Sequence, residues 1–91
     1  MSAPSKPRLA VVPSDPGIAA RVQRLQAEAK GLAREHVEEL IAAMLRVETI
    51  AIEVSKGGDA YPAGIRDIAR RLGEELDIRA QAIEAIGGRA Q

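Results

Sequence analysis

The spacing of apolar residues predicts a first helix over about residues 16–56. Between Ile18 and Val54, apolar side chains recur in steps of three and four residues, the heptad pattern of a helix that packs along one face against other helices. We call this line of apolar positions the apolar seam. His36 occupies one of its positions, and one extra step of four residues leads from His36 to Leu40. Asp15-Pro16, an N-cap acid followed by a proline suited to a first turn, marks the start of this helix.

A second helix is predicted over about residues 61–87. The pair Gly57-Gly58 ends the first helix, and apolar residues at helical spacing then run from Ile65 to Ile86. Two helices joined by a short loop run antiparallel, so the fold class we predict is all-α, a long antiparallel helical hairpin. A break at Gly31 would give a three-helix bundle instead. The apolar seam crosses Gly31 without a change of phase, so we favour one continuous helix.

The chain divides into an N-terminal tail, residues 1–14, and a helical hairpin domain, residues 15–91. Three prolines interrupt the tail, and a proline has no N–H to give to a helix or a strand, so we expect this tail to be disordered. The apolar run of the tail, Leu9–Val12, is far shorter than the hydrophobic part of a signal peptide. We therefore expect a cytoplasmic protein.

Large aliphatic residues along both predicted helices are more numerous than one hairpin can cover. A two-helix hairpin buries each apolar stripe on one side only, and small folds without disulfides or metals gain stability by association. Two hairpins packed face to face make a four-helix bundle, so we expect a homo-oligomer, first of all a dimer, or an equivalent contact with another protein. The residues expected at this interface are Leu32, Leu40, Ile41, Met44, Val47, Ile50, Val54, Ile65, Ile68, Leu72, Leu76 and Ile83.

Composition and charge exclude several classes of function. The chain has 13 Lys and Arg residues against 13 Asp and Glu residues, so no net charge attracts it to nucleic acid or to an anionic membrane. Tyr61 is the single aromatic residue and cysteine is absent, which excludes aromatic stacking platforms, disulfides and thiol chemistry. The longest apolar run, Leu40–Leu45, is far too short to span a membrane.

His36 with Glu39 is the candidate for a metal site. Di-iron helical bundles place Glu-x-x-His on inward faces, whereas here the order is reversed and the second helix has no histidine. Candidate catalytic residues are no better placed, since Glu35 and Glu38 lie on a helix surface without a cleft and Ser55 has no histidine to activate it. We therefore predict no metal, no cofactor and no enzymatic activity.

Charged residues on the second helix predict surface ion pairs. Opposite charges occur four residues apart, a spacing that brings side chains together on one side of a helix. The expected pairs are Asp67–Arg71, Arg70–Glu74, Arg71–Glu75 and Glu75–Arg79.

Residues 65–73 resemble the first helix and turn glycine of a helix-turn-helix DNA-binding motif. Such a motif needs a turn at Gly73 and an apolar-faced recognition helix after it, whereas here the two acids Glu74-Glu75 follow. In the other interpretation, Gly73 is a position of close packing in a continuous helix. If the segment did bind DNA, the residues facing phosphate would be Arg66, Arg70 and Arg71.

The function that the sequence favours is that of a small non-catalytic interaction or regulatory module. It would act by homo-oligomerisation and by helix packing with a protein partner. The alternative is a small DNA-binding transcriptional regulator that uses residues 65–73. We expect no membrane partner, and nucleic acid as a partner only in that alternative.

Overall fold

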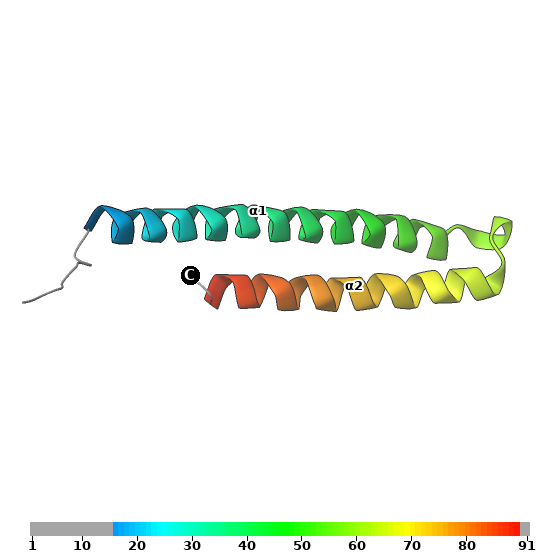
Figure 1. Ribbon diagram of the computed structural model, residues 1–91. Coiled ribbons are helices and arrows are strands. Elements are labelled where there is room, and N and C mark those ends of the chain that lie inside the picture. Colours follow the sequence, from blue (N-terminus) through cyan, green and yellow to red (C-terminus); the bar gives the residue numbers. More distant parts are fainter. Residues whose placement is uncertain (1–15, 90–91) are drawn as a thin grey trace, which may run out of the picture. The chain divides into compact units, whose positions relative to one another are not determined.

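Two helices and a short turn make up the part of the chain that the structure describes. The structure is a computed structural model, and it describes residues 16–89. Its elements are α1, Pro16–Ser55, a short 3-10 helix η1, Gly58–Ala60, and α2, Ala63–Arg89, and these residues contain no strand (Figure 1). The predicted all-α hairpin is confirmed, and its helices end within one or two residues of the predicted positions. The predicted tail, residues 1–14, lies outside the described residues.

α1 continues without a break through Gly31. A Cβ atom at Gly31 would meet nothing within 4 Å, so no contact requires a glycine there. The alternative three-helix arrangement, with a break at Gly31, is therefore wrong. The contacts of the chain fall into two units, Met1–Ala33 and Arg34–Gln91, and the pairing of α1 with α2 belongs to the second unit.

The turn between the helices contains two glycines, and the backbone requires glycine at one of them. Gly58 has a φ of 76°, in the left-handed region that residues with a side chain rarely adopt. Gly57 lies against the ring of Tyr61, and a Cβ atom at Gly57 would require that ring to move. The backbone N–H of Gly57 donates to the carbonyl of Val54 (3.1 Å), and that of Tyr61 donates to the carbonyl of Gly58 (3.1 Å). These bonds satisfy backbone groups that the end of α1 and the turn would otherwise leave unpaired.

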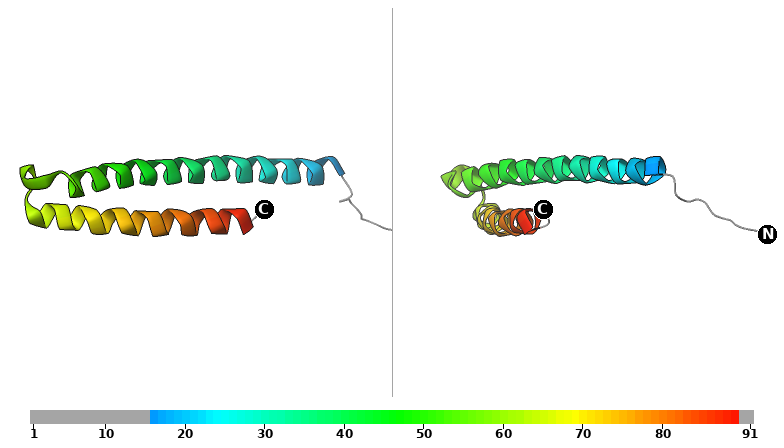
Figure 2. Two further views of the ribbon diagram at one scale, coloured as in Figure 1. Left: turned by 180° about the vertical axis from the view of Figure 1, so that it is seen from behind. Right: turned by 90° about the vertical axis from the view of Figure 1, so that its left-hand side faces the viewer.

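Small residues form the contact between α1 and α2, which run side by side (Figure 2). Among residues 17–88, the buried side chains and glycines are Ala51 of α1 and Ala69, Gly73 and Ala80 of α2. A Cβ atom at Gly73 would lie 3.2 Å from Cγ1 of Ile52, so glycine lets α2 approach α1 closely at this point. This confirms the interpretation of Gly73 as a close-packing position inside a continuous helix.

The buried residues belong to one stripe on each helix, which we call the contact stripes. Along both stripes the steps alternate between three and four residues, as in coiled-coil packing, and every member is buried or partly buried. The contact stripe of α1 consists of Ile41, Met44, Glu48, Ala51 and Ser55, and that of α2 of Ala69, Gly73, Leu76, Ala80, Ile83 and Gly87.

Candidate interaction surface

Most large apolar residues of the hairpin lie beside the contact stripes rather than on them. On α1, exposed Leu40 and Val47 each come one position before a contact residue, and on α2 exposed Leu72 comes directly before Gly73. A helix turns by about 100° per residue. On each helix, this step of one residue therefore places the exposed apolar stripe roughly a quarter-turn away from the contact.

Both exposed apolar stripes lie on the same side of the hairpin. Seen from one end, a step back along the chain rotates clockwise on one helix and anticlockwise on its antiparallel neighbour. Since the two contact stripes face each other, both rotations lead to the same side. We call this surface the apolar face, and its members are Leu40, Ala43, Val47, Ile50 and Val54 of α1 with Ile65, Ile68 and Leu72 of α2.

The apolar face is open to solvent. Apart from Ala43 and Val54, which are partly buried, its side chains are between 44% exposed, at Leu72, and 65% exposed, at Ile68. Soluble proteins expose scattered single aliphatic residues, but a continuous apolar surface typically marks a place where another molecule binds.

The structure divides the predicted interface residues between three places. Leu32 lies in the first unit and is 66% exposed. Partly buried on the contact stripes lie Ile41, Met44, Leu76 and Ile83. The other predicted interface residues all belong to the apolar face. The structure thus brings most of them together on the apolar face. The sequence pattern did not distinguish this face from the contact between α1 and α2.

An ion pair lies in line with the apolar residues of α2. Glu75 and Arg79 come one position before Leu76 and Ala80, so they share the side of α2 that carries Leu72. The Nε–H group of Arg79 donates to Oε2 of Glu75 over 2.7 Å, and both side chains are more than half exposed. The sequence predicted this pair, but its place on the apolar side follows only once the contact stripe is known.

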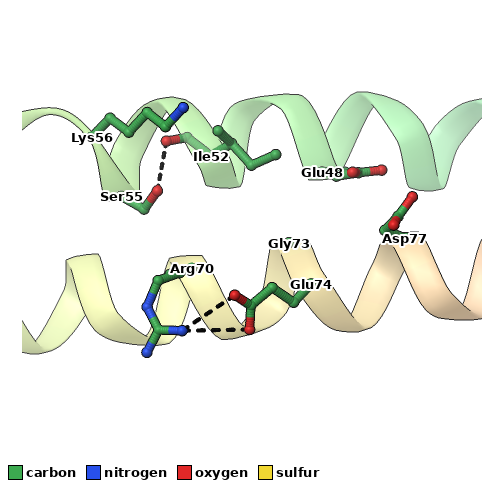
Figure 3. Close-up of a pocket in the computed structure, with 8 residues that line it drawn as sticks. All are labelled: Glu48, Ile52, Ser55, Lys56, Arg70, Gly73, Glu74 and Asp77. Carbon is green, nitrogen blue, oxygen red and sulfur yellow. Dashed lines mark hydrogen bonds and ion pairs between the residues drawn. The ribbon is translucent and has the colours of Figure 1, made fainter.

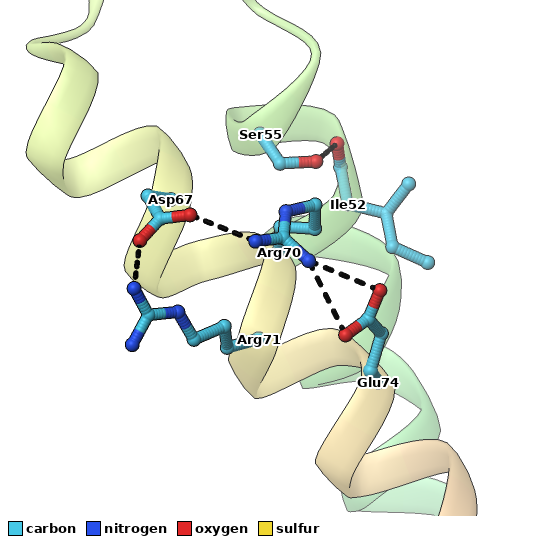
Figure 4. Close-up of polar contacts among 6 residues, drawn as sticks. All are labelled: Ile52, Ser55, Asp67, Arg70, Arg71 and Glu74. Atoms are coloured by element: carbon cyan, nitrogen blue, oxygen red, sulfur yellow. Dashed lines mark hydrogen bonds and ion pairs between the residues drawn. The ribbon is translucent and has the colours of Figure 1, made fainter.

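A network of charges on α2 centres on Asp67 (Figure 4). The guanidinium group of Arg70 donates to Asp67 (2.8 Å) and lies 3.3 Å from Glu74, and Arg71 also pairs with Asp67. The hydrogen bond from Arg70, assisted by Arg71, lowers the pKa of the Asp67 carboxyl below its ordinary value. The same bond, followed by the charge of Glu74, raises the pKa of Arg70. These contacts confirm the predicted pairs Asp67–Arg71 and Arg70–Glu74.

The helix-turn-helix interpretation of residues 65–73 is wrong at its turn. α2 continues as one helix from Ala63 to Arg89, because Gly73 packs against α1 and the helical apolar period continues beyond it. Each candidate phosphate ligand also has a carboxylate nearby. Arg70 and Arg71 pair with Asp67, and Arg66 lies 3.9 Å from Asp59 while donating to the carbonyl of Tyr61 (3.1 Å). Since no described feature favours DNA binding, we do not propose it.

A shallow groove between the helices carries groups of both charges (Figure 3). Its lining includes Glu48 of α1, Lys56 directly after α1, and Arg70, Glu74 and Asp77 of α2, around Gly73. The one hydroxyl there, Ser55, donates to the carbonyl of Ile52 in its own helix over 2.7 Å. The groove therefore offers no hydroxyl paired with a general base, the arrangement that activates a serine nucleophile.

His36 is exposed to solvent in the hairpin. Its Nε2 atom lies 3.9 Å from a carboxylate oxygen of Glu39, and the two side chains are 85% and 79% exposed. Within the described residues, no group of three or more histidine and acidic side chains is arranged to hold a metal ion. His36 and Glu39 thus form a loose surface pair on α1.

Comparisons with known proteins leave the apolar face as the feature from which function must be argued. No protein-family model matches the chain, and no curated protein and no solved structure is significantly similar to it. Neither helix of the described chain has the length and apolar character needed to cross a membrane.

Proposed function

We propose that this chain is a non-catalytic interaction module whose apolar face binds a second copy of the chain and so completes a four-helix bundle. The observation that carries the proposal is the exposure of large aliphatic side chains on one side of the hairpin, from Leu40 to Ile50 on α1 and from Ile65 to Leu72 on α2. Burial of such side chains gains roughly 1.5–3 kcal/mol each, and a facing hairpin buries them all at once.

The small contact inside the hairpin gives a second reason for self-association. The residues that the hairpin buries by itself are alanines and one glycine, whereas its leucines and isoleucines stay partly or largely exposed. A domain needs its large aliphatic side chains in a core, and two layers of secondary structure form one. A second hairpin supplies the missing layer, with the same surface used on both copies.

Sedimentation equilibrium of the purified chain and of two matched variants tests this function. Ile50→Glu places a charge on the apolar face, whereas Thr49→Glu makes the same side chain one residue earlier, away from that face. We expect a dimer at micromolar concentration for the unchanged chain and for Thr49→Glu. For Ile50→Glu we expect a shift towards monomer, because burying an unpaired carboxylate in the interface is costly.

Two outcomes would overturn the proposal. One is a stable, folded monomer of the unchanged chain at all concentrations up to the millimolar range. The other is equal association of both glutamate variants, which would mean that the chains associate through some other surface.

A further inference from the structure

The apolar stripe of α1 extends equally far on both sides of Val47. Leu40 and Val54 lie seven residues before and after it, and Ala43 and Ile50 lie four residues before and three residues after it. When this stripe faces its own copy in the antiparallel direction about Val47, Leu40 lies opposite Val54 and Ile50 lies near Ala43, so apolar residues face apolar residues along its whole length. This is the self-complementarity that an interface around a two-fold axis requires.

The corresponding side of α2 is symmetric about the level of Asp77. Glu75 and Arg79 lie two residues before and after it, and Ile68 and Ile86, which are 65% and 59% exposed, lie nine residues before and after it. When this side of α2 faces its own copy in the antiparallel direction, Glu75 therefore meets Arg79, Ile68 meets Ile86, and Leu72 meets Ala82.

The two centres of symmetry lie at the same level of the hairpin. Glu48, which follows Val47, and Asp77 line the same groove and lie near each other across it (Figure 3). A single axis that crosses both helices at this level can therefore relate both helices to their copies. Neither helix has to shift along the other to match its own pattern.

Two identical faces can meet around a two-fold axis in two ways. An axis along the helices places both turns at the same end, and α1 of one copy then faces α2 of the other. In that arrangement Val47 lies against Glu75 and Arg79 of the second copy, so charges are desolvated against an aliphatic side chain. An axis across the helices places the turns at opposite ends, and each helix then faces its own copy.

We propose that the dimer forms in this second way, with the two turns at opposite ends and the axis passing beside Val47 and between Glu75 and Arg79. Val47 then contacts Val47 of the second copy. Glu75 of each copy pairs with Arg79 of the other, so the two-fold axis produces two equivalent ion pairs. Each carboxylate then lies between two guanidinium groups, one of them on its own helix. The inference rests on the proposed self-association and assigns its geometry, with the charges setting register and orientation.

Single cysteine variants test the position of the axis, because the chain has no cysteine of its own. We expect Val47→Cys to form a disulfide-linked dimer on mild oxidation, since both cysteines lie at the axis. Ile50→Cys is the matched control. Its two cysteines would be separated by six residues of helix rise, roughly 9 Å, which is beyond the reach of a disulfide. Sedimentation in reducing buffer checks first that both variants associate.

The crosslinking outcomes separate this inference from the proposed function. Monomeric chains in reducing buffer would overturn the self-association itself. Dimers in which Val47→Cys fails to crosslink, or crosslinks no better than Ile50→Cys, would leave the self-association standing and overturn the crossing axis.

Charge reversal tests the pairing of Glu75 with Arg79 between copies. Glu75→Arg alone and Arg79→Glu alone each place like charges opposite one another, so we expect self-association to weaken roughly tenfold or more. An equimolar mixture of the two variants restores opposite charges at every contact, and so does the double variant. We expect both to regain the affinity of the unchanged chain. Failure of both to do so would overturn the proposed pairing.

Discussion

Gly73 determines how closely the two helices approach one another. Its missing side chain brings α2 to within 3.9 Å, measured from the position of a Cβ atom, of the backbone oxygen of Glu48 and of the Cβ atom of Ala51. Glycine inside a helix costs about 1 kcal/mol relative to alanine. The close contact of α2 with α1 offsets this cost. Gly58, in the turn, does not carry the same cost, because its left-handed conformation is one that glycine adopts readily.

Gly73→Leu should therefore destabilise the hairpin, by about 1–3 kcal/mol, because a large side chain forces the helices apart. The measurement is the midpoint of chemical denaturation followed by circular dichroism. Gly64→Leu is the matched control, since it makes the same substitution on the same helix where a Cβ atom would meet nothing within 4 Å. Equal effects of the two substitutions would mean that Gly73 has no packing role.

At the scale of the single helix, α2 is stabilised by charges four and three residues apart. Asp67 accepts hydrogen bonds from Arg70 and Arg71, and its pKa is lowered because its charged form is the one that these bonds stabilise. A carboxyl group whose pKa is lowered on folding adds stability above its ordinary pKa, near 3.8, and this stability is lost as the pH falls through the lowered value.

We expect acid to destabilise the hairpin in part through Asp67. The melting temperature should fall as the pH drops below about 4, and Asp67→Asn should reduce that fall while lowering the melting temperature slightly at about pH 7. Asp77→Asn is the control, because Asp77 accepts a hydrogen bond from the neutral Gln81 rather than from an arginine. An unchanged pH profile in Asp67→Asn would contradict the assignment.

The helices themselves could be predicted from the sequence, because each has a clear start, period and stop. The apolar seam crosses Gly31 in phase, and the observed helix continues there. The spacing of Asp67 and Arg71 predicted an ion pair that is present. The role of Gly73 could not be predicted, because glycine suits both a turn and a close-packing position. Only the neighbouring helix decides between the two.

The division of the apolar residues between two surfaces could not be predicted. A period of three and four residues shows that a stripe is buried against some helix, but not against which one. The contact within the hairpin uses Ala51, Ala69 and Ala80, whose small side chains contribute little to a hydrophobic pattern. The stripe of Leu40 and Val47 is stronger in the sequence, yet it stays exposed in the single chain.

For the whole molecule, the proposed dimer makes folding depend on concentration. A tenfold rise in protein concentration adds about 1.4 kcal/mol to the stability of a dimer, which should raise the melting temperature by roughly 3–6 °C. Melting curves at two concentrations measure this shift. The Ile50→Glu variant, which we expect to be monomeric, should melt at a lower temperature that does not change with concentration. A concentration-independent melt of the unchanged chain would contradict the dimer.

The small size of the buried contact has a consequence for the lifetime of the protein in a cell. A hairpin whose buried residues, among those described, are only three alanines and a glycine is expected to open easily on its own, and proteases cleave opened chains. Pairing through the apolar face would protect the chain, so newly made copies would survive only once they were abundant enough to meet one another. The cellular level of such a protein would then respond to its rate of synthesis as a threshold, with rapid turnover below it and accumulation above it.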